Sequence, residues 1–118
     1  MKFLSPFGPR IAILKIPTVL IEKINHEVES IINDKKKNKL NDYSKKLVGQ
    51  VQQEIELKNK FIKKNLKSYI TKSVNQYLKK NLNKKSKIIK IKNIWVVRQF
   101  KNEYNPLHFH DGNVSGVG

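Results

Sequence analysis

The apolar residues between Phe61 and Leu78 recur with the spacing of one helix face, and this stripe constrains the fold more than any other feature of the sequence. It predicts a long amphipathic helix over residues 57–82, with lysines on its outer face. Tyr69 and Tyr77 lie on the same stripe as the aliphatic residues. We therefore expect these two rings in the core or at its boundary, rather than in a platform on which nucleobases stack.

A strand and a shorter helix are predicted before this stripe. Residues 10–16, RIAILKI, form a short isoleucine-rich run between two prolines, which is typical of a strand. A helix is predicted from Pro17 to about Asn33, because proline suits a first helical turn and an apolar stripe follows it. That stripe comprises Leu20, Ile21, Ile24, Val28, Ile31 and Ile32. His26 lies off the stripe, so we expect it to face solvent rather than to bind a ligand.

The remaining segments differ in how clearly they can be interpreted. Residues 34–46 have no apolar period and predict a charged, Asn-rich loop. Residues 47–58 fit either a turn with a short extended piece or the approach to the long helix. After a polar break at residues 83–87, residues 88–100 alternate apolar and polar, which predicts a strand with Trp95 as a packing anchor. A turn should follow, and the LHFH segment then resumes an extended pattern.

This order of elements predicts an α+β fold in one domain that spans residues 1–118, with no internal repeat. The chain has no cysteine, which excludes disulfides, zinc–thiolate sites and thiol nucleophiles. Prolines and Arg10 interrupt the N-terminal apolar residues before a signal peptide can form, and no apolar run approaches the roughly 20 residues of a membrane span. We therefore expect a cytoplasmic protein without a membrane partner.

The formal net charge of +16 lies almost entirely in the middle of the chain, where residues 34–92 carry nineteen basic and four acidic side chains. One interpretation is a nucleic-acid partner for this basic region, because lysines on phosphates release counterions. The other is a solvated lysine face that reflects AT-rich codons, since Lys, Asn and Ile are all abundant. Only Arg10 and Arg98 carry the planar guanidinium that binds phosphate or guanine through two hydrogen bonds.

Two histidines near the C-terminal end form a candidate metal site. In a strand, His108 and His110 would project from the same face, and two imidazoles can bind Fe, Zn, Cu or Ni. Asp111 could add an oxygen ligand, although it would point to the other side of a continuing strand. The alternative is a structural or exposed pair. Small residues at Gly112, Ser115 and Gly116 follow, and they suit the wall of a ligand cavity.

The segment WVV followed by YNPLHFHDGNVSGVG resembles the characteristic block of a 2-oxoglutarate- and Fe(II)-dependent oxygenase family of marine bacteria and their phages. The matching residues are Trp95, Asn105, Pro106, His108, His110, Gly112, Ser115, Gly116 and Val117. The resemblance is sharp over residues 95–117 and loose over the rest of the chain.

This resemblance implies a double-stranded β-helix, or jelly-roll, in which two histidines and a carboxylate hold a non-haem iron. It implies His108, His110 and Asp111 as metal ligands. It also implies Asn105 and Ser115 as residues that bind the co-substrate. Such enzymes use 2-oxoglutarate and dioxygen to hydroxylate a C–H bond, and the substrate here would be an unidentified small molecule or peptidyl group.

The chain departs from the family pattern in three ways. Neither histidine begins an HxD motif, no histidine follows His110, and no basic residue follows Lys101 to pair with the co-substrate. A jelly-roll needs about eight strands, so we expect this chain to be the N-terminal part of a longer reading frame and inactive alone. The alternatives are a small nucleic-acid-binding protein that uses the basic region 34–92, and an interaction fragment without enzymatic activity.

Overall fold

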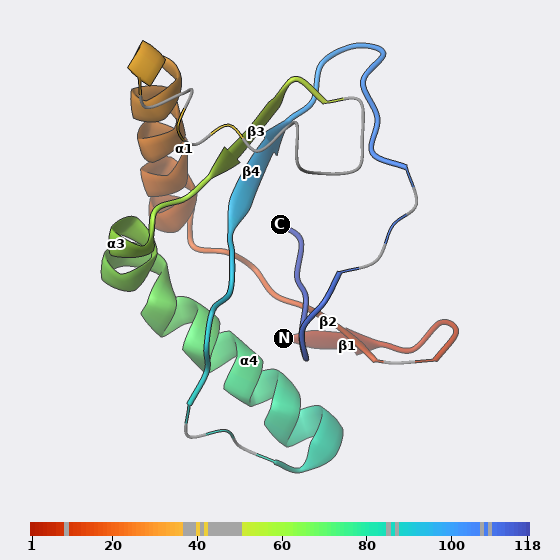
Figure 1. Ribbon diagram of the computed structural model, residues 1–118. Coiled ribbons are helices and arrows are strands. Elements are labelled where there is room, and N and C mark those ends of the chain that lie inside the picture. Colours follow the sequence, from red (N-terminus) through yellow and green to blue (C-terminus); the bar gives the residue numbers. More distant parts are fainter. Residues whose placement is uncertain are drawn as a thin grey trace.

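The computed structural model describes residues 1–8, 10–36, 40, 42, 51–84, 86, 88–106, 108 and 110–118. The fold combines helices with two small antiparallel sheets, as Figure 1 shows, so the predicted α+β class is confirmed. The elements are β1 Lys2–Leu4, β2 Ile11–Ile13, α1 Thr18–Ile32, β3 Gln53–Glu56, α3 Asn59–Phe61, η2 Ile62–Leu66, α4 Lys67–Leu82 and β4 Trp95–Arg98.

Both predicted helices are present. Helix α1 follows directly after Pro17 and ends before Asn33, and His26 is exposed on it as expected. The long helix runs without a break through α3, η2 and α4, and η2 is a π-helical turn. Asn83 ends the helix in the left-handed conformation, with φ of 51°, which asparagine tolerates better than most residues.

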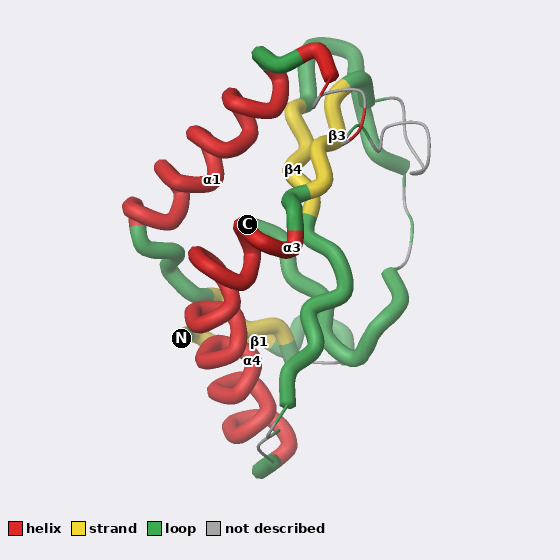
Figure 2. Tube along the Cα trace, turned by 60° about the vertical axis from the view of Figure 1, so that its left-hand side comes forward, coloured by secondary structure: helices red, strands yellow, loops and turns green. Residues whose placement is uncertain are grey.

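The hydrophobic core lies where α1, β3 and the start of the long helix meet. Figures 1 and 2 both show α1 beside the β3–β4 pair, with the long helix running below it. The core cluster consists of Val28, Ile31, Ile55, Leu57, Ile62 and Leu66. Ile31 and Ile55 have the largest fully buried side chains, with 2% and 1% of their surface exposed. Helix α1 and the start of the long helix therefore bury their apolar stripes against each other and against one face of the β3–β4 sheet.

The N-terminal hairpin β1–β2 packs against α4. The Phe3 ring stacks on Tyr77, with 6.3 Å between ring centroids. The Tyr77 hydroxyl donates a hydrogen bond to the Arg10 carbonyl at 3.0 Å, and the Tyr69 hydroxyl donates one to the Lys15 carbonyl at 3.2 Å. Both tyrosines are half-buried, so the prediction that they lie at the core boundary is confirmed.

The predicted strands are longer than the observed ones. Only residues 11–13 of the predicted strand 10–16 pair, because their partner β1 has three residues. The prediction of a strand over residues 88–100 is wrong for residues 88–94, which belong to no strand. Burial does alternate from Ile88 to Lys92. However, β3 has only four residues, and on this side it pairs with Trp95–Arg98, while an isolated bridge joins Ile55 to Asp42 on the other side.

The segment between α1 and β3 is only partly described. Lys35, Lys36 and Leu40 have helical conformation, which contradicts the predicted loop at these positions, while residues 43–50 lie outside the described residues. Strand β3 resolves the ambiguity of residues 47–58 in favour of an extended piece. Across the described residues, no helix has the length and apolar character that a bilayer crossing requires.

Candidate metal centre

The β3–β4 sheet has two chemically different faces. Residues directly opposite each other in an antiparallel pair share a face, and the faces alternate along each strand. Ile55 lies opposite Val96, and both belong to the hydrophobic core. Glu54 lies opposite Val97 and Glu56 lies opposite Trp95, so these four residues occupy the other face. We call this second face the outer face of the sheet.

His110 lies against the outer face through Trp95. The two ring centroids are 5.6 Å apart, with an angle of 41° between the ring planes. The His108 and His110 rings meet edge to face, with 4.7 Å between centroids and 3.1 Å between their Nε2 atoms. The two imidazoles are therefore adjacent, although neither histidine belongs to a strand.

A backbone contact orients His108. Its Nδ1 lies 2.7 Å from the Pro106 carbonyl oxygen. A carbonyl only accepts, so Nδ1–H donates this bond and the neutral ring keeps a free lone pair on Nε2. The Nε2–H of His110 can then donate to that lone pair. Metal-binding histidines commonly donate their second ring N–H to a backbone carbonyl in this way.

Asp111 has Lys92 as its ion-pair partner, and the charge of His110 also acts on it. Its carboxylate forms an exposed ion pair with the Lys92 ammonium. The hydrogen bond from Lys92 and the positive charge of Lys92 lower the pKa of Asp111 below its ordinary value. Asp111 therefore stays ionised, but its negative charge is directed at a lysine.

Glu54 is a buried carboxylate that sequence reasoning missed. Only 3% of its surface is exposed. Burial raises its pKa and so does the charge of Asp42, while the charge of His108 lowers it. Glu54 is thus close enough to His108 for the two charges to interact. The alternation of Glu54, Ile55, Glu56 and Leu57 could have indicated its position on the outer face, but nothing in the neighbouring sequence indicates that this carboxylate is buried.

Asn105 and Ser115 do not join the histidine pair. Both residues are exposed. Within the part of the chain that the structure describes, no hydrogen bond connects either side chain to His108 or His110. Among the same residues, no group of three or more His, Asp or Glu side chains is placed to hold a metal ion. The geometry therefore brings two imidazole side chains together on one side of the sheet.

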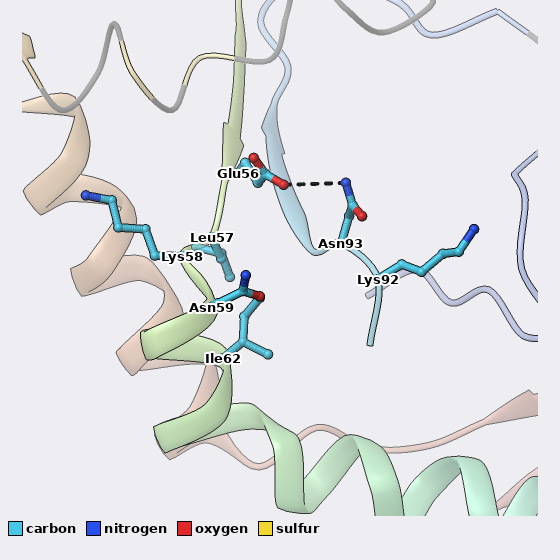
Figure 3. A pocket seen from close by; sticks show the side chains of 7 residues that line it. All are labelled: Glu56, Leu57, Lys58, Asn59, Ile62, Lys92 and Asn93. Carbon is cyan, nitrogen blue, oxygen red and sulfur yellow. Dashed lines mark hydrogen bonds between the residues drawn. The ribbon is translucent and has the colours of Figure 1, made fainter. Parts of the chain in front are cut away.

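A pocket lies where β3 leads into α3. Its volume is about 240 Å³, and Figure 3 shows its seven lining side chains. Asn93 Nδ2 donates a hydrogen bond to Glu56 Oε1 at 3.4 Å, and Lys92 also lines the pocket. No histidine is among the residues that line the pocket.

Comparisons with protein-family models, with curated proteins and with solved structures find no significant match to this chain. The resemblance to an oxygenase family therefore rests on the residues of the sequence itself. The class of site that the geometry defines is a pair of adjacent imidazoles.

Replacing Glu54 by glutamine tests the environment of that carboxylate. Its raised pKa means that the folded state disfavours the ionised form, so stability falls as pH rises through the folded pKa. We expect Glu54→Gln to raise the melting temperature at pH 7, and this gain should shrink as pH falls below the ordinary Glu pKa of about 4.3. Thermal unfolding followed by circular dichroism at several pH values measures the difference.

Glu22→Gln is the matched control, because Glu22 is exposed on α1. This substitution should change the melting temperature little at either pH. A Glu54→Gln protein that is less stable than the parent at pH 7 would contradict the inferred cost of ionising Glu54.

Proposed function

We propose that His108 and His110 are two ligands of a non-haem Fe(II) centre, in a 2-oxoglutarate-dependent oxygenase of the hydroxylating type. The observation that carries this proposal is the 3.1 Å separation of their Nε2 atoms. Two imidazole nitrogens that bind one ion at about 2.1 Å in adjacent positions lie about 3 Å apart. If the His110 proton moved from Nε2 to Nδ1, both rings would stay neutral and both Nε2 lone pairs would be available to one metal ion.

The residues around the pair fit a metal site in part. The Pro106 carbonyl holds the His108 ring with its Nε2 lone pair free, and Trp95 supports the His110 ring. Glu54 contributes negative charge on the same side of the sheet, which favours a cation. Asp111 fits less well, because binding a metal would require it to leave Lys92. We therefore propose Glu54, rather than Asp111, as the carboxylate that supports metal binding.

The resemblance of residues 95–117 to the oxygenase block supports the remaining assignments. A bound Fe(II) with 2-oxoglutarate would supply oxidative decarboxylation and hydroxylation of a C–H bond. Asn105 and Ser115 are exposed polar residues on either side of the histidines in the sequence, and we propose them as contacts for the co-substrate. We likewise propose that the antiparallel pair β3–β4 belongs to a jelly-roll. A cytoplasmic location and a small-molecule or peptidyl substrate complete this proposal.

Anaerobic titration with Fe(II) and 2-oxoglutarate tests the function. We expect one Fe(II) per chain, and a weak visible charge-transfer band when 2-oxoglutarate is added, because its 2-oxo and carboxylate oxygens chelate the metal. Metal and co-substrate should each strengthen the binding of the other.

Glutarate is the matched control, because it keeps both carboxylates and lacks the 2-oxo group. It should give no band and should not strengthen Fe(II) binding. Absence of Fe(II) uptake would exclude the metal centre. Metal uptake without any difference between 2-oxoglutarate and glutarate would keep a metal site but exclude this class of oxygenase.

A further inference from the structure

The long helix and the segment after it carry positive charge without any acidic residue. From Leu57 to Lys92 the sequence contains thirteen lysines and no Asp or Glu. AT-rich codons would enrich lysine along the whole chain. However, residues 1–33 carry four basic and three acidic side chains, and residues 93–118 carry two of each. The excess is therefore confined to particular elements of the fold, which coding bias alone does not explain.

Four of these lysines occupy adjoining turns near the start of the helix. Lys60, Lys63, Lys64 and Lys67 follow each other at spacings of three and four, and all are exposed. We call these four residues the lysine face. Like charges at such spacings repel each other and destabilise a helix. No ion pair links any of the four to a carboxylate within the described residues. Solvent counterions or a bound partner must therefore reduce this repulsion.

The other exposed residues of the helix are almost all polar. Between Lys58 and Asn81, the exposed side chains are Lys, Asn, Ser or Gln without exception. An amphipathic helix that binds a membrane surface needs apolar side chains to insert beside its basic residues. The exposed apolar side chain of α4, Leu82, lies at its C-terminal end, away from the lysine face. Amide and hydroxyl groups instead donate hydrogen bonds to phosphate oxygens. The surface therefore suits a hydrated polyphosphate backbone better than a lipid bilayer.

We propose that the lysine face binds the phosphodiester backbone of double-stranded nucleic acid without sequence preference. Lysine is a point charge that lacks the planar fork of arginine, so it attracts phosphates without reading base edges. Stacking on unpaired bases is disfavoured, because Tyr69 and Tyr77 are half-buried and donate their hydroxyls to the backbone of the N-terminal segment. This inference depends on no residue of the proposed metal centre.

The experiment compares two variants of equal net charge. One replaces the lysine face, Lys60, Lys63, Lys64 and Lys67, by glutamine. The other replaces Lys2, Lys15, Lys23 and Lys101, four exposed lysines outside the basic region, in the same way. Glutamine has nearly the helix propensity of lysine, and circular dichroism checks that both variants fold.

Fluorescence anisotropy with a mixed-sequence DNA duplex measures affinity at several salt concentrations. For the parent chain, we expect log affinity to fall linearly with log salt, with a slope of about −0.9 for each phosphate contact. The variant without the lysine face should bind at least about tenfold more weakly at 50 mM salt and show a slope shallower by roughly three. The control variant should keep the parent slope.

Equal losses in the two variants would overturn the proposal, since they would indicate an effect of net charge rather than of this surface. Absent or salt-insensitive DNA binding by the parent would also overturn it. Binding to vesicles that contain anionic lipid, without binding to the duplex, would assign the lysine face to a membrane surface instead.

Discussion

Replacing Ile55 by alanine is expected to lower the free energy of unfolding by about 2–4 kcal/mol. Ile55 is 1% exposed, lies opposite Val96 in the sheet and belongs to the core cluster between the sheet and the helices. The substitution removes buried methyl and methylene groups and leaves a cavity that its neighbours fill only in part. Because domains of this size are typically stable by about 5–15 kcal/mol, this side chain accounts for a large share of the free energy of unfolding.

Urea unfolding followed by far-ultraviolet circular dichroism measures this loss as a lower midpoint with an unchanged slope. Ile88→Ala is the control, because it deletes the same atoms from a side chain that is 83% exposed, and it should change stability by less than about 0.5 kcal/mol. Similar losses for both variants would mean that Ile55 is not the centre of the core.

Replacing either His108 or His110 by alanine is expected to weaken Fe(II) binding by roughly a hundredfold or more. Loss of a residue that merely supports a metal ligand commonly costs 10–100-fold in affinity, and we propose that these imidazoles bind the metal directly. Both histidines are exposed, so their removal should leave the fold intact. Competition with a chelator of known affinity, under anaerobic conditions, measures each constant.

Glu54→Gln and Asp111→Asn decide which carboxylate supports the metal. The charge of each carboxylate interacts with a histidine, Glu54 with His108 and Asp111 with His110, but Asp111 is also paired with Lys92. We therefore expect the larger loss of affinity for Glu54→Gln. A larger loss for Asp111→Asn would instead assign this role to Asp111. Parent-like affinity in both histidine variants would exclude the proposed centre.

The helices were predictable because helical amphipathicity is a local property. The apolar spacing around Leu66 and Tyr77 follows directly from the geometry of 3.6 residues per turn, whichever partner the helix meets. Pro17 similarly marks a helix start through its own ring and missing N–H. The π-helical turn from Ile62 to Leu66 has no such local signal, so a regular helix was expected there.

The strands were less predictable, because pairing requires a partner from elsewhere in the chain. Ile89 and Ile91 have the alternation of a strand, and both are half-buried. They remain unpaired because β3 extends only from Gln53 to Glu56. Conversely, β1 has too few residues for any period to appear, and its pairing depends on β2.

The candidate site was likewise predictable only in its local features. The HxH spacing predicts that His108 and His110 project together, since side chains two residues apart in extended backbone share a side. Nothing in the neighbouring sequence indicates that Trp95 supports one ring, that Lys92 holds Asp111, or that Glu54 lies buried near His108. Each of these contacts joins segments that are distant in the chain.

The sequence by itself therefore determined the two amphipathic helices, the α+β class, the concentration of positive charge and the paired histidines. These features depend on residue type and on the repeat of the local backbone. Only the tertiary structure decided that Glu54 is buried and that its charge interacts with His108, because these contacts join β3 to segments that are distant in the chain. That arrangement brings a carboxylate to the side of the sheet where the histidines lie.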